Sequence, residues 1–196
     1  MNGGVFILAN QICENAKGAL RSMRNLEIKE NILFQLDMCW QLYVYHTDNI
    51  EEPEALWAFS PTGLQVRKQE EGWCIDWPET ESYEIGPSSI AWIMWHIIYW
   101  WSTAIDCNFG DGALKKEDIH WPGSVEKAKA TISLLHDKWV SKLNDLPDAD
   151  YQLKQYAKWP LVDRSFADIA LWLNAELMKN ATEIGYGRFL YAARIK

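Results

Sequence analysis

The sequence predicts an all-α protein that folds as a four-helix bundle with long links between the helices. Three observations predict this fold class. Four long segments carry apolar residues three to four positions apart, which is the spacing of one helix face. The segments between them concentrate Pro and Gly, and no internal repeat relates the four. At 196 residues, of which 48% are hydrophobic, the chain is expected to form one domain over residues 1–196.

The first predicted helix runs from Ile32 to about His46. Its sequence reads ILFQLDMCWQLYVYH and is amphipathic at a period close to that of an α-helix. The apolar residues that define its buried face are Leu33, Leu36, Trp40 and Tyr43.

A long insertion separates the first predicted helix from the second. Residues 51–86 are rich in Pro and Gly and hold two short alternating pieces, LQVRK and WCIDW, which predict a small hairpin. The sequence GPSS at 86–89 then supplies a Ser N-cap. The second helix is expected to read IAWIMWHIIYWWSTAID and to end near Gly110.

Two further helices complete the predicted bundle. Ser124 opens the third, which runs to about Leu143. The last has the clearest start, because Ser165 is followed three residues later by Asp168, an acidic variant of the capping box. It continues to roughly Ala193, a rod of about 40 Å. In such bundles, sites are built from inward-facing side chains of different helices.

Charge and cysteine usage exclude several classes of protein. The net charge is −8 and Lys and Arg are not clustered, so no nucleic-acid partner is expected. The apolar start at residues 5–9 is too short to span a bilayer, so we expect a cytoplasmic protein without a membrane segment. No CxxC motif is present, so the cysteines are expected to be free thiols. They are Cys13, Cys39, Cys74 and Cys107.

A histidine interrupts the apolar second helix. His96 follows Trp92 by four residues and precedes Tyr99 and Trp100 by three and four, so its imidazole is expected on an aromatic face. A histidine in this setting is most often a core residue whose hydrogen bonds are satisfied. The alternative is a metal ligand, because neutral imidazole commonly binds metals.

The last predicted helix carries a polar stripe formed by Glu176, Asn180 and Glu183. One interpretation is a solvated face in which Lys179 pairs with Glu176 or Glu183. The other is the floor of a polar site, because the helix starts with the apolar stretch FADIALWL and is expected to lie largely inside the bundle. A buried Glu176 would then need a partner for its charge, and His96 and Lys179 are the candidates.

These segments resemble a known family. The sequence AWIMWHIIYWWSTA is similar to the second helix of the DinB/YfiT-like superfamily, bacterial four-helix-bundle proteins in which a His on that helix is the first metal ligand. The sequence ELMKNATEIGYGRFLY is similar to the last helix of that superfamily, and HWPGS also looks like its link before the third helix. The resemblance covers roughly residues 30–194 and implies a helical-bundle metalloenzyme.

The resemblance implies a metal site made of His96, Glu176 and Asn180. The spacing is sound, because side chains four apart on one helix converge and a facing helix can supply a third donor. The superfamily has His where this chain has Asn180. An amide oxygen is a weak, hard donor, so Zn or Ni would be held poorly. The site is expected either to bind a divalent metal, Zn, Ni or Mn, through an altered ligand set, or to persist without metal.

Two functions follow from this resemblance. The first is a metal-dependent hydrolase, thiol transferase or isomerase, in which a low-molecular-weight thiol binds the metal and Glu183 orients a ligand or accepts a proton. In that enzyme Trp92, Tyr99 and Trp100 would shape the pocket. The second is a non-catalytic, stress-associated binding bundle with a vestigial metal site. Either would take a small molecule or thiol as partner, and the resemblance also implies a homodimer.

Overall fold

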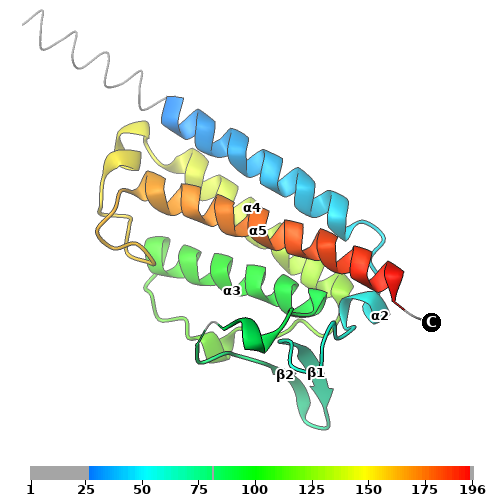
Figure 1. Cartoon of the computed structure of the whole chain (residues 1–196). Coiled ribbons are helices and arrows are strands. Elements are labelled where there is room, and N and C mark those ends of the chain that lie inside the picture. Colours follow the sequence, from blue (N-terminus) through cyan, green and yellow to red (C-terminus); the bar gives the residue numbers. More distant parts are fainter. Residues whose placement is uncertain (1–26, 81, 195–196) are drawn as a thin grey trace, which may run out of the picture.

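In the part of the chain that the structure describes, four long helices run side by side (Figure 1). In this computed structural model, which describes residues 27–80 and 82–194, the first helix covers residues 27–47. The other three are α3 (Ile90–Phe109), α4 (Val125–Asp145) and α5 (Phe166–Ala193). The predicted all-α four-helix bundle is confirmed, and the first helix is longer than predicted.

The first helix and α5 run parallel to each other. The Nδ2 atom of Asn174 donates to the carbonyl of Ile32, and further along both helices the guanidinium of Arg188 donates to the carbonyl of His46. Because the contacting residues advance together in both helices, the helices point in the same direction (Figure 1).

The helix α3 runs antiparallel to α5 and parallel to α4. Phe109 at the end of α3 packs against Phe166 at the start of α5, with ring centroids 5.4 Å apart. At the opposite end, Ile90 at the start of α3 lies beside Gly187 of α5. Phe109 also contacts Trp139 in the second half of α4, which sets the shared direction of α3 and α4.

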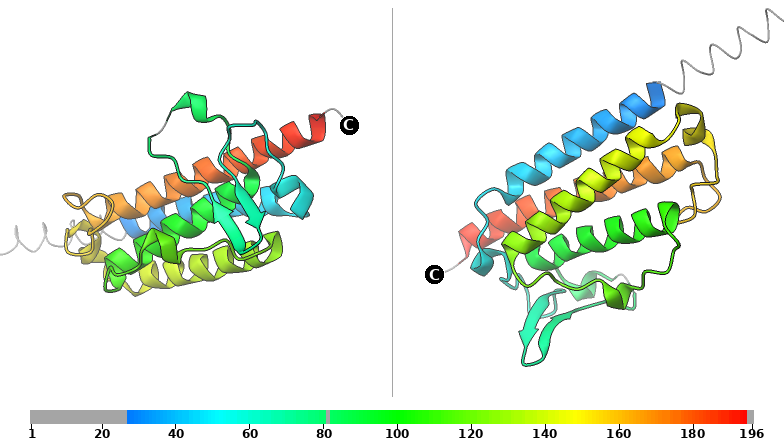
Figure 2. Two further views of the ribbon diagram at one scale, coloured as in Figure 1. Left: turned by 90° about the horizontal axis from the view of Figure 1, so that it is seen from below. Right: turned by 180° about the vertical axis from the view of Figure 1, so that it is seen from behind.

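The directions of the helices determine the paths of the two segments that connect α3, α4 and α5. Because α3 and α4 are parallel, residues 110–124 have to return along the bundle, and a 3₁₀ turn, η2 (Lys116–Asp118), lies on this path (Figures 1 and 2). Residues 146–165 join α4 to α5 at one end of the bundle and contain η3 (Asp148–Gln152).

The insertion after the first helix contains the predicted hairpin. A short helix, α2 (Glu52–Ala55), comes first. The strands β1 (Val66–Gln69) and β2 (Gly72–Ile75) then pair antiparallel. A 3₁₀ turn, η1 (Tyr83–Ile85), leads to α3. The hairpin projects from one side of the bundle (Figure 2).

Serine side chains cap three of the helices where the sequence predicts helix starts. Ser89 accepts a hydrogen bond from a backbone N–H in the first turn of α3, and Ser124 does so in α4. Ser165 accepts from the backbone N–H of Asp168, whose carboxylate accepts from the N–H of Ser165 in return. These caps satisfy N–H groups that have no partner within the helix.

Large aromatic side chains fill the core where α3 ends and α5 begins. We call this cluster, Phe109, Trp139, Tyr151 and Phe166, the aromatic end. The ring centroid of Phe166 lies 5.9 Å from that of Trp139 and 5.5 Å from that of Tyr151. Trp139, Tyr151 and Phe166 are fully buried. Burial of this much apolar surface is the main stabilising contribution at this end.

Asn108 fastens the α4–α5 link to the aromatic end. Its Nδ2 atom donates to the carbonyls of Ala104 and Trp159, at 2.8 and 2.9 Å. Its Oδ1 atom accepts from the backbone N–H groups of Lys158 and Trp159. A buried amide side chain with this many partners is fully satisfied.

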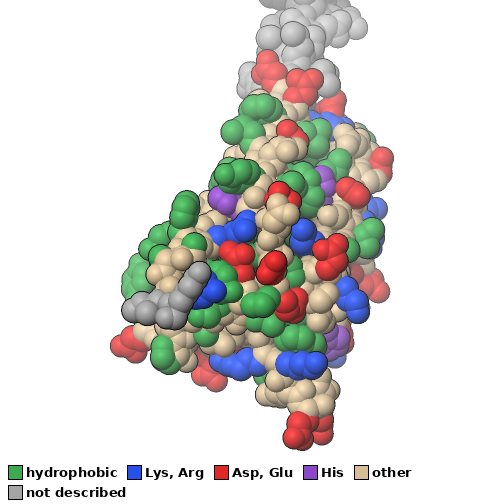
Figure 3. Space-filling model, turned by 90° about the vertical axis from the view of Figure 1, so that its right-hand side faces the viewer, with side chains coloured by type: hydrophobic (Ala, Val, Ile, Leu, Met, Phe, Trp, Pro, Cys, Tyr) green, Lys and Arg blue, Asp and Glu red, His purple; other side chains and the backbone are tan. Residues whose placement is uncertain are grey.

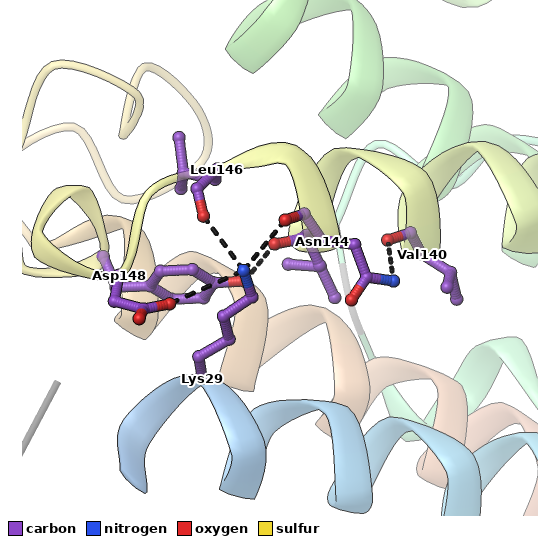
Figure 4. Close-up of polar contacts among 7 residues, drawn as sticks. Lys29, Val140, Asn144, Leu146 and Asp148 are labelled. Carbon is purple, nitrogen blue, oxygen red and sulfur yellow. Dashed lines mark hydrogen bonds and ion pairs between the residues drawn. The ribbon is translucent and has the colours of Figure 1, made fainter. Parts of the chain in front are cut away.

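Lys29 of the first helix closes the C-terminal end of α4 (Figure 4). Its Nζ atom donates to the carbonyls of Asn144 and Leu146, at 2.9 and 3.1 Å, and lies 3.5 Å from Oδ1 of Asp148. The last carbonyls of a helix lack partners within the helix and carry partial negative charge, so an ammonium group there is stabilising.

Two glycines let other segments approach the C-terminal half of α5. A Cβ atom at Gly185 would lie 2.5 Å from the ring of His46 in the first helix. A Cβ atom at Gly187 would lie 2.6 Å from the ring of Phe59 in the insertion. Both distances are shorter than van der Waals contact, so glycine here permits close packing of the first helix and the insertion on α5.

Three of the four cysteines lie in the described part of the chain. Cys39 is buried, Cys74 and Cys107 are partly buried, and all three are free, in agreement with the prediction of free thiols. Cys13 lies outside the described residues.

Among the described residues, no helix combines the length and the apolar character needed to span a bilayer. On the face of the molecule seen in Figure 3, acidic and basic side chains are interspersed rather than gathered by sign.

Candidate functional site

His96 lies in the first half of α3 and faces α5. Its Nδ1 atom is 3.2 Å from Oδ1 of Asn180, and Nε1 of Trp100 donates to its Nε2 atom at 2.6 Å. The imidazole also stacks on Trp92, with centroids 4.8 Å apart and planes 19° from parallel. An indole N–H can only donate, so Nε2 carries no proton and Nδ1–H donates to Asn180. Both ring nitrogens are therefore engaged within the protein.

The surroundings of His96 keep the imidazole uncharged. Burial lowers the pKa of His96 from 6.5 to about 4, the hydrogen bond to Asn180 raises it, and the positive charge of Lys179 lowers it. At neutral pH the site therefore contains a neutral ring with a fixed tautomer.

Asn180 is the most deeply buried member of the predicted polar stripe. Its side chain is 1% exposed and lies on the side of α5 that meets α3. A buried amide oxygen needs a donor, and His96 supplies it. The structure thus brings together two of the residues that the sequence analysis assigned to one site.

Glu176 lies one turn before Asn180 and pairs with Lys179. The Nζ atom of Lys179 is 2.7 Å from Oε2 of Glu176. The angles of this contact fall outside hydrogen-bonding geometry, and Oε2 is buried without a hydrogen-bond partner among the described residues. Of the two partners suggested for Glu176 by the sequence, Lys179 is the one found.

Glu183 lies one turn after Lys179, at the edge of a cavity. Part of its side chain reaches the surface, but the atoms packed around the carboxylate raise the pKa of Glu183 by desolvation. The charge of Lys179 lowers this pKa, and the charge of Glu176 raises it. Within the described part of the chain, Glu183 has no ion-pair partner, since Lys179 is engaged by Glu176.

The cavity beside His96 has a volume of about 450 Å³. It lies between α3, α5 and the insertion, and this size is typical of sites for small organic molecules. Trp92 and His96 line it from α3, and Lys179, Glu183 and Tyr186 line it from α5. The insertion contributes Phe59, Leu64, Ser82 and Ile85. Apolar walls with a few polar groups at one side are the usual composition of a ligand site.

Tyr99 and Trp100, which the sequence analysis placed beside Trp92 in a pocket, do not line this cavity. Tyr99 packs on Trp77, with ring centroids 5.1 Å apart. Trp100 packs on Trp159 and Trp172, at 5.1 and 4.9 Å, and its indole nitrogen faces His96. Trp100 therefore touches the site through His96.

Comparison with known proteins places these features in a family. The family model described as the DinB superfamily matches residues 35–184. The chain belongs to the DinB superfamily. No curated protein matches it, and no solved structure does. The four-helix bundle is consistent with this membership.

The donors at the expected metal position of this DinB-superfamily protein do not fit a transition metal as they are arranged. No three His, Cys, Asp or Glu residues gather as a metal-binding group among the described residues. The lone pair of His96 Nε2 is taken by Trp100, and the Oδ1 atom of Asn180 is taken by His96. Oε2 of Glu176 is in contact with Lys179. A metal would have to displace each of these contacts.

The part of the cavity made by the insertion has no signature in the sequence. Phe59, Leu64 and Ile85 lie in Pro- and Gly-rich chain without periodic spacing, so no pattern marks them as site residues. On α5, helical spacing does indicate further residues of the cavity wall. Tyr186 and Leu190 continue the side of the helix that carries Lys179 and Glu183, at helical spacing.

Proposed function

We propose that this DinB-superfamily protein binds a small organic molecule in the cavity between α3, α5 and the insertion. His96 forms a polar part of the cavity wall, held by its hydrogen bond to the buried Asn180, and the two residues do not serve as metal ligands. The observation that carries the proposal is the engagement of both His96 nitrogens, by Trp100 and by Asn180.

The proposal is supported by the chemistry of the cavity walls. Aromatic and aliphatic side chains supply apolar surface, and a ligand that covers them would gain roughly 25 cal/mol for each Å² of apolar area removed from water. His96 lines the cavity in its neutral form, since its pKa is about 4. A neutral imidazole costs less to bury beneath an apolar ligand than a charged one.

A metal-dependent hydrolase, thiol transferase or isomerase is the second candidate. It is favoured by the approach of His96 to Asn180, with Glu176 one turn away on α5. It requires Trp100 to release His96 and Lys179 to release Glu176. In this candidate Glu183, beside the cavity, keeps the role of catalytic or ligand-orienting group, and a low-molecular-weight thiol and a homodimer remain predictions.

Metal content separates the two candidates. Protein purified without a metal-chelating tag is analysed for bound metal and then heated with added Zn²⁺, Ni²⁺ or Mn²⁺. The binding protein is expected to contain no stoichiometric metal, and its unfolding temperature should not rise with any of the three ions. Stoichiometric metal in the purified protein would overturn the proposal.

A pair of substitutions tests whether metal binding is prevented because the donor atoms of His96 and Asn180 are already engaged within the protein. Trp100→Phe lets Nε2 of His96 carry the ring proton, so that Nδ1 can present its lone pair toward residue 180, and Asn180→His adds the second imidazole there. The double variant is expected to bind Zn²⁺ at least about tenfold more tightly than the natural protein, because imidazole is the better donor for zinc. Trp100→Phe alone is the matched control, and its affinity for Zn²⁺ should rise little.

Ligand binding itself is tested with a neutral probe, 3-phenylpropanol, followed by tryptophan fluorescence, because Trp92 lines the cavity. The natural protein is expected to bind the probe saturably. Leu190→Trp, which fills part of the cavity, is expected to abolish this binding while leaving the unfolding temperature within a few degrees. Equal binding by both proteins would place the probe elsewhere and contradict the proposal.

A further inference from the structure

The charged residues that line the cavity are few and unequal in their contacts. Among the described residues they are Lys179 and Glu183, four residues apart on α5. Lys179 is held by Glu176, which contributes its charge from the preceding turn. On this part of α5, two carboxylates therefore accompany one ammonium group.

Of these two carboxylates, only that of Glu183 lines the cavity. Its carboxylate has no ion-pair partner among the described residues, and it lies on the cavity edge while Glu176 does not line the cavity. An anion that entered the cavity would approach Glu183, and the one ammonium group that the described residues contribute to the lining, that of Lys179, already lies 2.7 Å from Glu176. The electrostatics of the site therefore favour a positive ligand.

The other walls suit the body of such a ligand. Phe59, Trp92 and Tyr186 contribute aromatic rings, and Leu64 and Leu190 contribute aliphatic surface. Organic cations are attracted both by a carboxylate and by the faces of aromatic rings, whereas a hydrated metal ion would gain nothing from the apolar walls. Charge and apolar surface thus occupy different parts of one cavity.

We propose that the ligand of this cavity is an organic monocation, an amine or quaternary ammonium with an apolar body, whose positive group pairs with Glu183. The apolar body lies between the insertion and Trp92. This inference rests on the proposed binding function and specifies its ligand class.

Three probes that share one phenylpropyl body test the charge preference. They are 3-phenylpropylammonium, 3-phenylpropanol and 3-phenylpropionate, which are positive, neutral and negative at about pH 7. Their dissociation constants are measured by calorimetry and tryptophan fluorescence. The cation is expected to bind about fivefold or more tightly than the alcohol, and the carboxylate more weakly than either.

Two matched substitutions locate the effect. Glu183→Gln is expected to remove most of the fivefold preference for the cation while leaving the affinity for 3-phenylpropanol unchanged. Glu70→Gln, at the exposed turn of the hairpin, keeps the same change in net charge and should preserve the preference. A loss of preference in both variants would mean that only overall charge matters, and it would overturn the inference.

The outcomes distinguish this inference from the function on which it rests. If all three probes bind equally and Leu190→Trp abolishes all of them, the cavity binds ligands but the monocation inference is wrong. If no probe binds the natural protein, the proposed binding function fails and the inference fails with it.

Discussion

The two ends of the α3–α5 contact differ in how their polar groups are used. At the aromatic end, Asn108 forms four hydrogen bonds to the backbone, and Trp139, Tyr151 and Phe166 are buried, with Nε1 of Trp139 the one buried polar side-chain atom of this described cluster that lacks a hydrogen bond. Near the cavity, Asn180 bonds to another side chain, Glu176 pairs with Lys179, and Glu183 lacks an ion-pair partner within the described residues. Packed aromatic rings dominate one end, whereas the other end keeps charged side chains that a ligand can contact.

This contrast explains how one bundle can accommodate an incompletely satisfied site. Removing the Glu176 carboxylate from water costs free energy that its ion pair with Lys179 returns only in part. The close packing of the aromatic end offsets that cost, and the hydrogen bonds of Lys29 to the end of α4 stabilise the fold further. Substitutions at the two ends are therefore expected to have different consequences.

The largest effect is expected at the aromatic end. Phe166→Ala should lower the free energy of unfolding by about 4 kcal/mol, because it removes a fully buried ring and leaves a cavity among large neighbours. Urea-induced unfolding followed by circular dichroism measures the loss. Phe189→Ala on the same helix removes a ring that is 74% exposed and should change stability by less than about 0.5 kcal/mol. Similar losses in the two variants would contradict the assignment of stability to this end.

The next effect concerns His96 and pH. Because its pKa is lowered from 6.5 to about 4 in the folded state, the unfolded chain binds more protons than the folded protein between these values. The contribution of this group to stability is fully present above pH 6.5 and is lost as the pH falls toward 4. The loss should amount to roughly 3 kcal/mol.

Comparison of variants assigns that loss to His96. Unfolding by urea at several pH values should give a flatter stability profile for His96→Gln than for the natural protein. The control is His120→Gln, since His120 is exposed, and its profile should follow that of the natural protein. Identical profiles for all three proteins would show that His96 is not held in its neutral form.

The smallest effect is expected at the end of α4. Lys29→Met keeps the aliphatic stem but removes the ammonium that bonds to the carbonyls of Asn144 and Leu146, so it should cost about 1 kcal/mol. Lys138→Met, on the exposed side of α4, is the matched control and should stay within about 0.5 kcal/mol of the natural protein. A larger loss from Lys138→Met would contradict the capping role of Lys29.

The sequence by itself determined the helices and their starts. Apolar spacing placed the four helices, and the serines at 89, 124 and 165 placed three N-caps, because both signals depend on neighbours within one or two turns. Helical spacing also put Glu176, Asn180 and Glu183 on one stripe, and the family resemblance brought His96 to the same site. The hairpin within 51–86 followed from alternation and turn residues.

Only the tertiary structure decided how these groups are used. The hydrogen bond from Trp100 to His96 joins residues one turn apart, yet whether the imidazole is left open to a ligand depends on where α5 places Asn180. The walls supplied by Phe59, Leu64 and Ile85 come from chain without periodicity, folded against α3 and α5. Local spacing fixes which face of a helix a side chain occupies, whereas its partners are set by contacts between segments far apart in the chain.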